Sequence, residues 1–115
     1  MKIVKLNDVP TSEINMDGVK NLVKQIPIGS MDGSPHFSFR VFTIGKDGHT
    51  PYHSHPYEHL NYIISGKGAI KKSDNEEIAI ETGYFSLILA DEMHQYVNKS
   101  NEPLVVICAV PKEKE

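Results

Sequence analysis

Short apolar runs separated by turn residues are the feature that most restricts the fold of this chain. Runs rich in Val, Ile, Phe, Tyr and Leu cover residues 37–44, 60–64, 77–80, 85–89 and 104–110. Gly, Pro, Asn, Asp and Ser occupy the breaks at 27–35, 45–48, 65–68, 73–75, 82–83, 90–92 and 98–103. Apolar runs of this kind favour strands, and short strands at regular spacing are typical of a sandwich or barrel. The sequence therefore predicts an all-β protein.

The two ends of the chain are less regular. Val19, Leu22 and Val23 lie at helical spacing within residues 16–25, but Gly18 stands near the start. An extended amino-terminal strand is the alternative that we favour over a helix. Residues 111–115 place four charges after Pro111, which predicts a frayed, solvated end.

Composition excludes several classes of function. The formal charge of −3 provides no basic field for nucleic acid or for an anionic membrane surface. The apolar run at 104–110 is far too short to span a bilayer, and no apolar signal segment follows Met1 and Lys2. The single cysteine, Cys108, allows neither an intrachain disulfide nor a cluster of thiolates around zinc. We expect a soluble protein located in the cytoplasm.

Six histidines are unusual in 115 residues, and histidine is the commonest metal ligand. On a strand, His53, His55 and His59 share one parity and would point to the same face, whereas Glu58 would point to the other. A fourth imidazole is available from His94, which follows a turn. Exposed strand histidines are the alternative interpretation, and the third histidine on the same face favours a metal site.

The histidine segment resembles a known family. The stretch His53 to His59, His-Ser-His-Pro-Tyr-Glu-His, with a glycine before and after it, resembles the first cupin motif, and residues 83–98 resemble the second. The positions that match the two motifs are Gly48, His53, His55, Gly66, Gly83, His94 and Asn98, although the gap from Gly48 to His53 is one residue short.

The chain departs from the cupin pattern at three positions. His59 stands where the pattern has a glutamate ligand, which resembles the four-histidine subgroup of small single-domain cupins, some of them manganese-binding. Leu89 and Asp91 replace a proline and a glycine of the second motif, and they leave the conformation of the turn at 90–93 open.

The resemblance implies a cupin double-stranded β-helix, a jelly-roll barrel, with one divalent metal ion per chain. It implies a single domain, 1–115, with a barrel core of about 37–110 and an amino-terminal strand extension, 1–36. The implied metal ligands are His53, His55, His59 and His94. Manganese or iron is favoured, and zinc, nickel or copper would also accept imidazoles. Octahedral geometry would leave two open positions, whereas a tetrahedral four-histidine site would be closed and structural.

Three further residues are candidates for the pocket. Tyr96 has the parity of His94 and would line the interior, either at the site or as an ordinary barrel aromatic. The resemblance places Cys108 near the metal, although a small buried apolar residue is the commoner role. Arg40, the only arginine, would either anchor a substrate carboxylate inside the barrel or, as we favour, form a salt bridge at the rim.

The function implied by the resemblance is a metal-dependent, oxygenase-type enzyme that acts on a small organic molecule. The alternative is a non-catalytic cupin that binds or senses a small molecule through its metal. We expect no nucleic-acid or membrane partner. We also expect a homodimer, because residues 3–28 carry apolar side chains that a small barrel cannot all cover.

Overall fold

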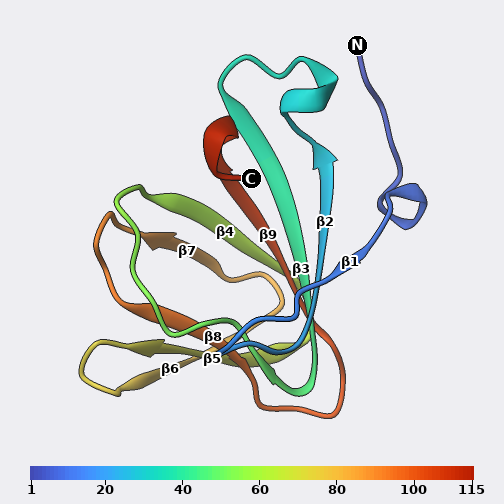
Figure 1. Ribbon diagram of the computed structural model, residues 1–115. Coiled ribbons are helices and arrows are strands. Elements are labelled where there is room, and N and C mark those ends of the chain that lie inside the picture. Colours follow the sequence, from blue (N-terminus) through green and yellow to red (C-terminus); the bar gives the residue numbers. More distant parts are fainter.

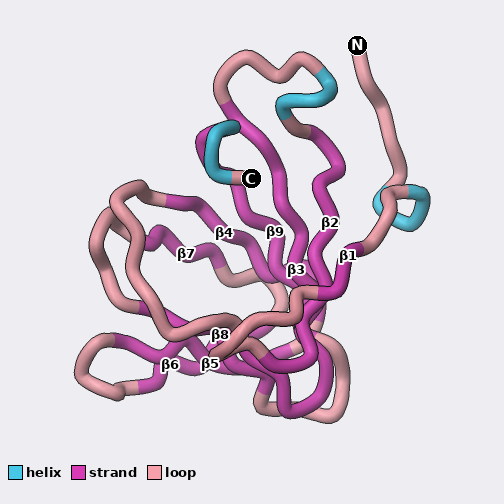
Figure 2. The backbone as a smooth tube through the Cα atoms, in the orientation of Figure 1, coloured by secondary structure: helices cyan, strands magenta, loops and turns pink.

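Antiparallel strands dominate the computed structural model, which describes all 115 residues (Figure 1). The strands are β1 (Ser12–Glu13), β2 (Lys20–Ile28), β3 (Phe37–His49), β4 (His59–Ser65), β5 (Lys67–Lys72), β6 (Glu77–Glu81), β7 (Phe85–Ile88), β8 (His94–Asn98) and β9 (Leu104–Pro111). Three single-turn 3-10 helices are η1 (Leu6–Asp8), η2 (Ser30–Asp32) and η3 (Lys112–Lys114) (Figure 2). None of these helices has the length or the apolar character of a membrane span. The predicted all-β class is confirmed.

The strands form one curled sheet in the order β6-β5-β8-β3-β9-β4-β7, with β2 and β1 attached to β3. In Figure 1 the sheet folds into two layers, one with β7, β4, β9 and β2 and the other with β8, β5 and β6. Strand β3 belongs to both layers, because its residues 37–44 pair with β9 and its last residue, His49, pairs with Val97 of β8. This arrangement is the predicted jelly roll.

Residues 45–48 were predicted to end a strand, and this prediction is wrong because β3 continues to His49. Leu22 pairs with Ile44 and Lys20 pairs with His49, so residues 45–48 bulge within β3. The turn residues serve to bend the strand from one layer into the other, and Asp47 adopts a left-handed φ of 61° there. The Asn98 amide donates hydrogen bonds to the carbonyls of Ile44 and Gly45, at 2.9 and 3.1 Å, and holds the bend.

The amino-terminal segment forms a strand and not a helix, as we favoured. Residues 20–28 form β2 and pair with β3, and Leu22 packs in the core beside Ile44. Packing against an existing strand outweighs the helical spacing of the apolar residues. The Gln25 amide donates to the carbonyls of Leu6 and Val9, which attaches the first residues to β2.

The predicted frayed carboxyl terminus is also wrong. The Glu115 carboxylate accepts hydrogen bonds from the Ser30 amide at 3.0 Å, from the Ser30 hydroxyl at 2.6 Å and from the Ser38 hydroxyl. Those three donors provide the partners that a solvated tail would lack, and they keep η3 beside the start of β3.

The hydrophobic core lies between the two layers. Strands β4, β8 and β9 each alternate buried and partly exposed residues along the chain. The buried core cluster consists of Leu22, Ile44, Ile63, Ile70, Ile80, Tyr96, Leu104 and Val106. The turn after β4 depends on Gly66, whose φ is +87° and whose hypothetical Cβ would lie 2.2 Å from the Pro103 carbonyl oxygen. This packing fixes the inward residues of β4, β8 and β9 that face the site.

Candidate metal centre

The segment between β3 and β4 carries the histidine motif and runs along β8. The amide of His53 donates to the His94 carbonyl at 3.1 Å, and the amide of His94 donates to the His53 carbonyl at 2.9 Å. The Thr50 amide donates to the Tyr96 carbonyl at 3.0 Å. The backbone itself therefore places His53 opposite His94.

The predicted strand through His53 and His55 is wrong, because residues 50–58 form an irregular loop with only an isolated bridge at His53. Pro51 and Pro56 have no amide hydrogen for a ladder, so this segment cannot run as a regular strand. The curvature of the loop, rather than strand alternation, brings its histidines to the cavity. His59, the first residue of β4, does follow the inward phase of its strand.

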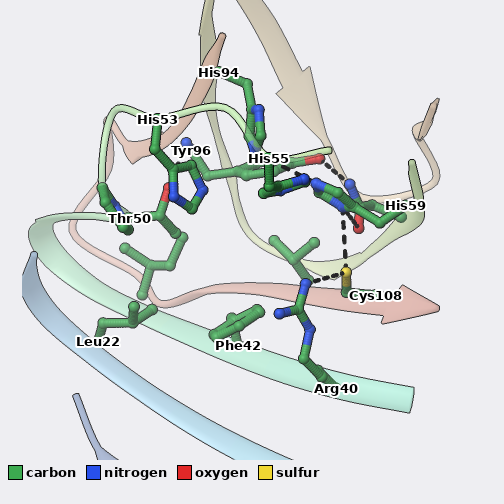
Figure 3. Close-up of a pocket in the computed structure, with 14 residues that line it drawn as sticks. Leu22, Arg40, Phe42, Thr50, His53, His55, His59, His94, Tyr96 and Cys108 are labelled. Atoms are coloured by element: carbon green, nitrogen blue, oxygen red, sulfur yellow. Dashed lines mark hydrogen bonds between the residues drawn. The ribbon is translucent and has the colours of Figure 1, made fainter. Parts of the chain in front are cut away.

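The four predicted histidines converge on one point between the layers (Figure 3). Ligand nitrogens of His53, His55 and His94 all lie within 4.8 Å of one another, so these three residues could hold a metal ion. His59 is adjacent, with its Nε2 atom 3.3 Å from Nε2 of His94 and its ring centroid 4.8 Å from that of His55.

Carbonyl oxygens fix the tautomers of three of these imidazoles. Nδ1–H of His55 donates to the Tyr57 carbonyl at 3.0 Å, and Nδ1–H of His94 donates to the Glu92 carbonyl at 2.8 Å. Nδ1–H of His59 donates to Oδ1 of Asn61 at 3.0 Å. An imidazole that donates from Nδ1 presents the lone pair of Nε2, which is the usual arrangement of a metal-bound histidine.

The facing Nε2 atoms of His59 and His94 test whether a metal ion fits. Neither atom carries a proton, so two lone pairs oppose each other at 3.3 Å unless a cation lies between them. Two imidazoles on one ion at about 2.0–2.1 Å have nitrogens roughly 2.8–3.0 Å apart at octahedral angles and roughly 3.3–3.4 Å apart at tetrahedral angles. The residues present therefore suit a divalent metal ion.

Burial lowers the pKa of three of these imidazoles, those of His53, His59 and His94. Desolvation, followed by the neighbouring histidines His94 and His55, lowers the pKa of His53 to about 4. Desolvation also lowers the pKa of His59 to about 4 and lowers the pKa of His94. Neutral imidazoles are the form that binds metal, so the site is ready for a metal ion at neutral pH.

The histidines open into a cavity of about 70 Å³. This volume holds a few water molecules or a ligand of a few heavy atoms. The cavity is lined by Leu22, Arg40, Phe42, Ile44, Thr50, Pro51, His53, His55, His59, Asn61, His94, Tyr96, Val106 and Cys108. No carboxylate lines it, and Glu58 is exposed.

The structure places Arg40 and Cys108 on the cavity wall, and they contact each other (Figure 3). Nη2 of Arg40 donates to Sγ of Cys108 at 3.1 Å, and the same sulfur lies 3.3 Å from Nδ1 of His59. The favoured rim salt bridge of Arg40 is wrong, because the ion pairs of the structure involve only lysines. Arg40 and Phe42 point inward on β3, where no acidic side chain is present.

Tyr96 also lines the cavity, and it belongs to a buried polar chain that the sequence analysis missed. The Asn61 amide donates to the Tyr96 hydroxyl and, at 3.4 Å, to the Ser86 hydroxyl. The Tyr96 and Ser86 hydroxyl oxygens lie 2.7 Å apart. Burial raises the pKa of Tyr96 to about 12, so its hydroxyl keeps its proton. The sequence could have indicated that Asn61 lies at the site, because it stands two residues after His59 on the inward face of β4.

The conformation of the turn at 90–93 is set by Asp91. Asp91 takes a φ of 64° at the position where the cupin pattern has glycine, and its amide donates to the His55 carbonyl at 2.7 Å. Asp tolerates this left-handed region better than most residues do. His36 and His49 do not line the cavity.

Fold and site together define a jelly-roll barrel with a histidine cluster suited to a metal ion. Residues 40–110 match the Cupin domain family, and the chain belongs to that family. No curated protein matches the sequence.

Solved structures agree with this assignment. The polyketide cyclase RemF from Streptomyces resistomycificus is similar over 96% of this chain and 79% of its own, with 25% identity and a TM-score of 0.91. A predicted oxalate decarboxylase from Thermotoga maritima is similar over 96% of this chain and 99% of its own, with 18% identity and a TM-score of 0.83. A cupin-2 domain protein from Rhodospirillum rubrum has 18% identity and a TM-score of 0.82 over 96% of this chain and 74% of its own. The last two likenesses concern the fold alone.

Proposed function

We propose that this cupin is a metal-dependent enzyme that acts on a small organic molecule in an oxygen-dependent reaction. The observation that carries the proposal is the set of unprotonated Nε2 atoms that converge in one cavity. We propose His53, His55, His59 and His94 as the ligands of one divalent ion, preferably manganese or iron. Such an ion would supply Lewis-acid and redox chemistry and, because imidazoles are neutral, would keep its full positive charge.

The chain's own residues then have defined tasks. The Tyr57 and Glu92 carbonyls and the Asn61 amide orient three imidazoles. Apolar side chains on the cavity wall, among them Leu22 and Val106, exclude bulk water from the space beside the histidines. The Tyr96 hydroxyl, which stays protonated, is available as a hydrogen-bond donor.

A second candidate is favoured by the likeness to RemF. That protein is a polyketide cyclase and is 25% identical to this chain. The second candidate is therefore a ring-closing reaction without an oxidant, in which a substrate carbonyl is polarised. The absence of carboxylates from the cavity wall suits both candidates, because the positive charge of the ion stays uncompensated.

One experiment separates these candidates. The full chain is stripped of metal, reloaded with Mn²⁺, Fe²⁺ or Zn²⁺, and incubated with a panel of small unsaturated, hydroxylated and carbonyl compounds while oxygen uptake and product mass are recorded. We expect oxygen uptake with manganese or iron and none with zinc. Equal product with zinc under nitrogen would replace this reaction with the cyclase type. Three inert proteins that all retain the same small ligand would overturn catalysis in favour of a binding protein.

A further inference from the structure

The guanidinium of Arg40 lines the cavity and has no acidic partner there. Its Nε atom is buried and has no hydrogen-bond partner. Nη1 donates to the Lys114 carbonyl at 3.3 Å, and Nη2 donates to the Cys108 sulfur at 3.1 Å. Sulfur is a weak acceptor, whereas the guanidinium has five N–H donors and is always charged. The strongest donor set of the cavity therefore lacks an acceptor of matching strength.

The neighbours of Arg40 hold it in place and leave its charge uncompensated. The guanidinium carbon lies 5.1 Å from the centroid of the Phe42 ring, which supports it by a cation–π contact. None of the 14 residues on the cavity wall is Asp or Glu. A half-buried cation with no counter-charge on the cavity wall favours an anionic ligand.

Size and wall chemistry narrow the class of anion. The cavity of about 70 Å³ admits only a few heavy atoms. Leu22, Ile44 and Val106 form an apolar part of its wall, so the ligand also has an apolar portion. A carboxylate matches the planar fork of a guanidinium with two parallel hydrogen bonds.

We propose that Arg40 is the anion subsite of this cavity, and that it binds the carboxylate of a small organic acid whose other end lies beside the histidines. This inference rests on the proposed function in that both assign the substrate to the same cavity. The inference specifies the proposed small-molecule substrate as a short-chain carboxylate, and it assigns Arg40 a direct contact with that carboxylate.

The test uses the fact that Arg40 is the only arginine in the chain. Its Nε–H resonance in a ¹⁵N-labelled full-length protein is therefore unique. Pyruvate, its neutral analogue pyruvamide and inorganic phosphate are titrated into the metal-free and the zinc-loaded protein, with the resonance and the heat of binding recorded. We expect pyruvate to shift the resonance in both forms and pyruvamide to leave it unmoved.

Variants then attribute the binding to the side chain. In Arg40→Met we expect pyruvate to bind roughly 10- to 100-fold more weakly, the range for loss of charge-assisted hydrogen bonds. Arg40→Lys keeps the charge but not the planar guanidinium, so we expect its affinity for pyruvate to lie between those of the wild type and Arg40→Met. The lysine variant is the test if Arg40→Met fails to fold. Lys46→Met removes the same charge from an exposed part of the β3 bend and leaves binding unchanged.

Three results would overturn the subsite: a resonance that does not move at saturating pyruvate, equal binding of pyruvate and pyruvamide, or wild-type affinity in Arg40→Met. Phosphate binding that exceeds pyruvate binding would overturn the carboxylate assignment. These titrations need no turnover. Pyruvate binding at Arg40 without any activity on the panel leaves the subsite in place and refutes the enzyme, whereas turnover of neutral compounds without pyruvate binding refutes the subsite alone.

Discussion

The Nε2 atoms of His59 and His94 lie 3.3 Å apart although their strands, β4 and β8, are not neighbours in the sheet. Each imidazole is turned toward the other by an Nδ1–H bond, to Asn61 on one side and to the Glu92 carbonyl on the other. The two imidazoles face each other across the cavity from the two layers of the barrel, where a metal ion would bridge them.

Metal content is the direct test of the ligand set. We expect about one ion per chain in the wild type and loss of stoichiometric metal in His55→Ala or His94→Ala, measured by elemental analysis after gel filtration. His36→Ala is the matched control, because His36 is exposed and outside the cavity, and it keeps the full content. Retention of one ion in His94→Ala would refute the site.

Asn61 is expected to tune metal affinity without touching the ion. Asn61→Leu removes the acceptor of the His59 Nδ1–H bond, which we expect to weaken metal binding by roughly 10- to 100-fold in chelator competition. Ser86→Ala removes a contact of the Asn61 amide that lies farther from the histidine, and it has a smaller effect. Equal losses in both variants would assign the effect to general destabilisation.

Acid is expected to destabilise the metal-free protein over a defined range. The pKa values of His53 and His59 fall to about 4 in the folded chain, below the usual 6.5. Between these values the unfolded chain binds more protons, so stability is complete above pH 6.5 and declines as the pH falls toward 4. We expect the melting temperature to drop by several degrees across this range. His53→Ala flattens the decline and His36→Ala does not, whereas a flat wild-type curve would contradict the prediction.

Open coordination positions are expected to respond to small anions. Azide added to the copper-loaded protein should change its visible spectrum, because no carboxylate neutralises the ion and water is displaced readily. A closed four-histidine structural site would give an unchanged spectrum. His55→Ala loaded with copper provides the comparison in which the original site is broken.

A homodimer remains our expectation for the assembly. Phe39, Leu60, Phe85 and Leu87 are 44–80% exposed and line one groove on the outer face of β3, β4 and β7. A second copy related by a two-fold axis would cover this apolar face. Light scattering should give twice 12.9 kDa for the wild type and 12.9 kDa for Leu60→Lys. Ile78→Lys on β6 is the control, and a monomeric wild type would refute the dimer.

The class of fold could be predicted from the spacing of the apolar runs, and the set of converging histidines from the resemblance to the cupin motifs rather than from strand parity. Strand β5 escaped notice because its lysines and Gly68 do not form an apolar run, although Ala69 and Ile70 are buried. The bend of β3 was read as a break because a bulge and a turn use the same residues. Only the pairing with β2, β8 and β9 distinguishes the two.

The direction of Arg40 was not available from its strand. Phenylalanines stand on both parities, and the structure exposes Phe37 and Phe39 while Phe42 faces the cavity. Which face is inner depends on the layer that β3 joins, a non-local choice that no local pattern encodes. Residues from several strands form the cavity wall, so the lack of an acidic partner for Arg40 cannot be predicted from any one strand.

The two hydrogen bonds that join His53 to His94 run entirely between main-chain atoms. The attachment of the loop to β8 therefore does not depend on the side chains at positions 53 and 94. A substitution at either position changes the chemistry offered to the cavity while the loop stays attached. The barrel can therefore change the ligand at position 53 or at position 94 and keep the main-chain contact between the loop and β8.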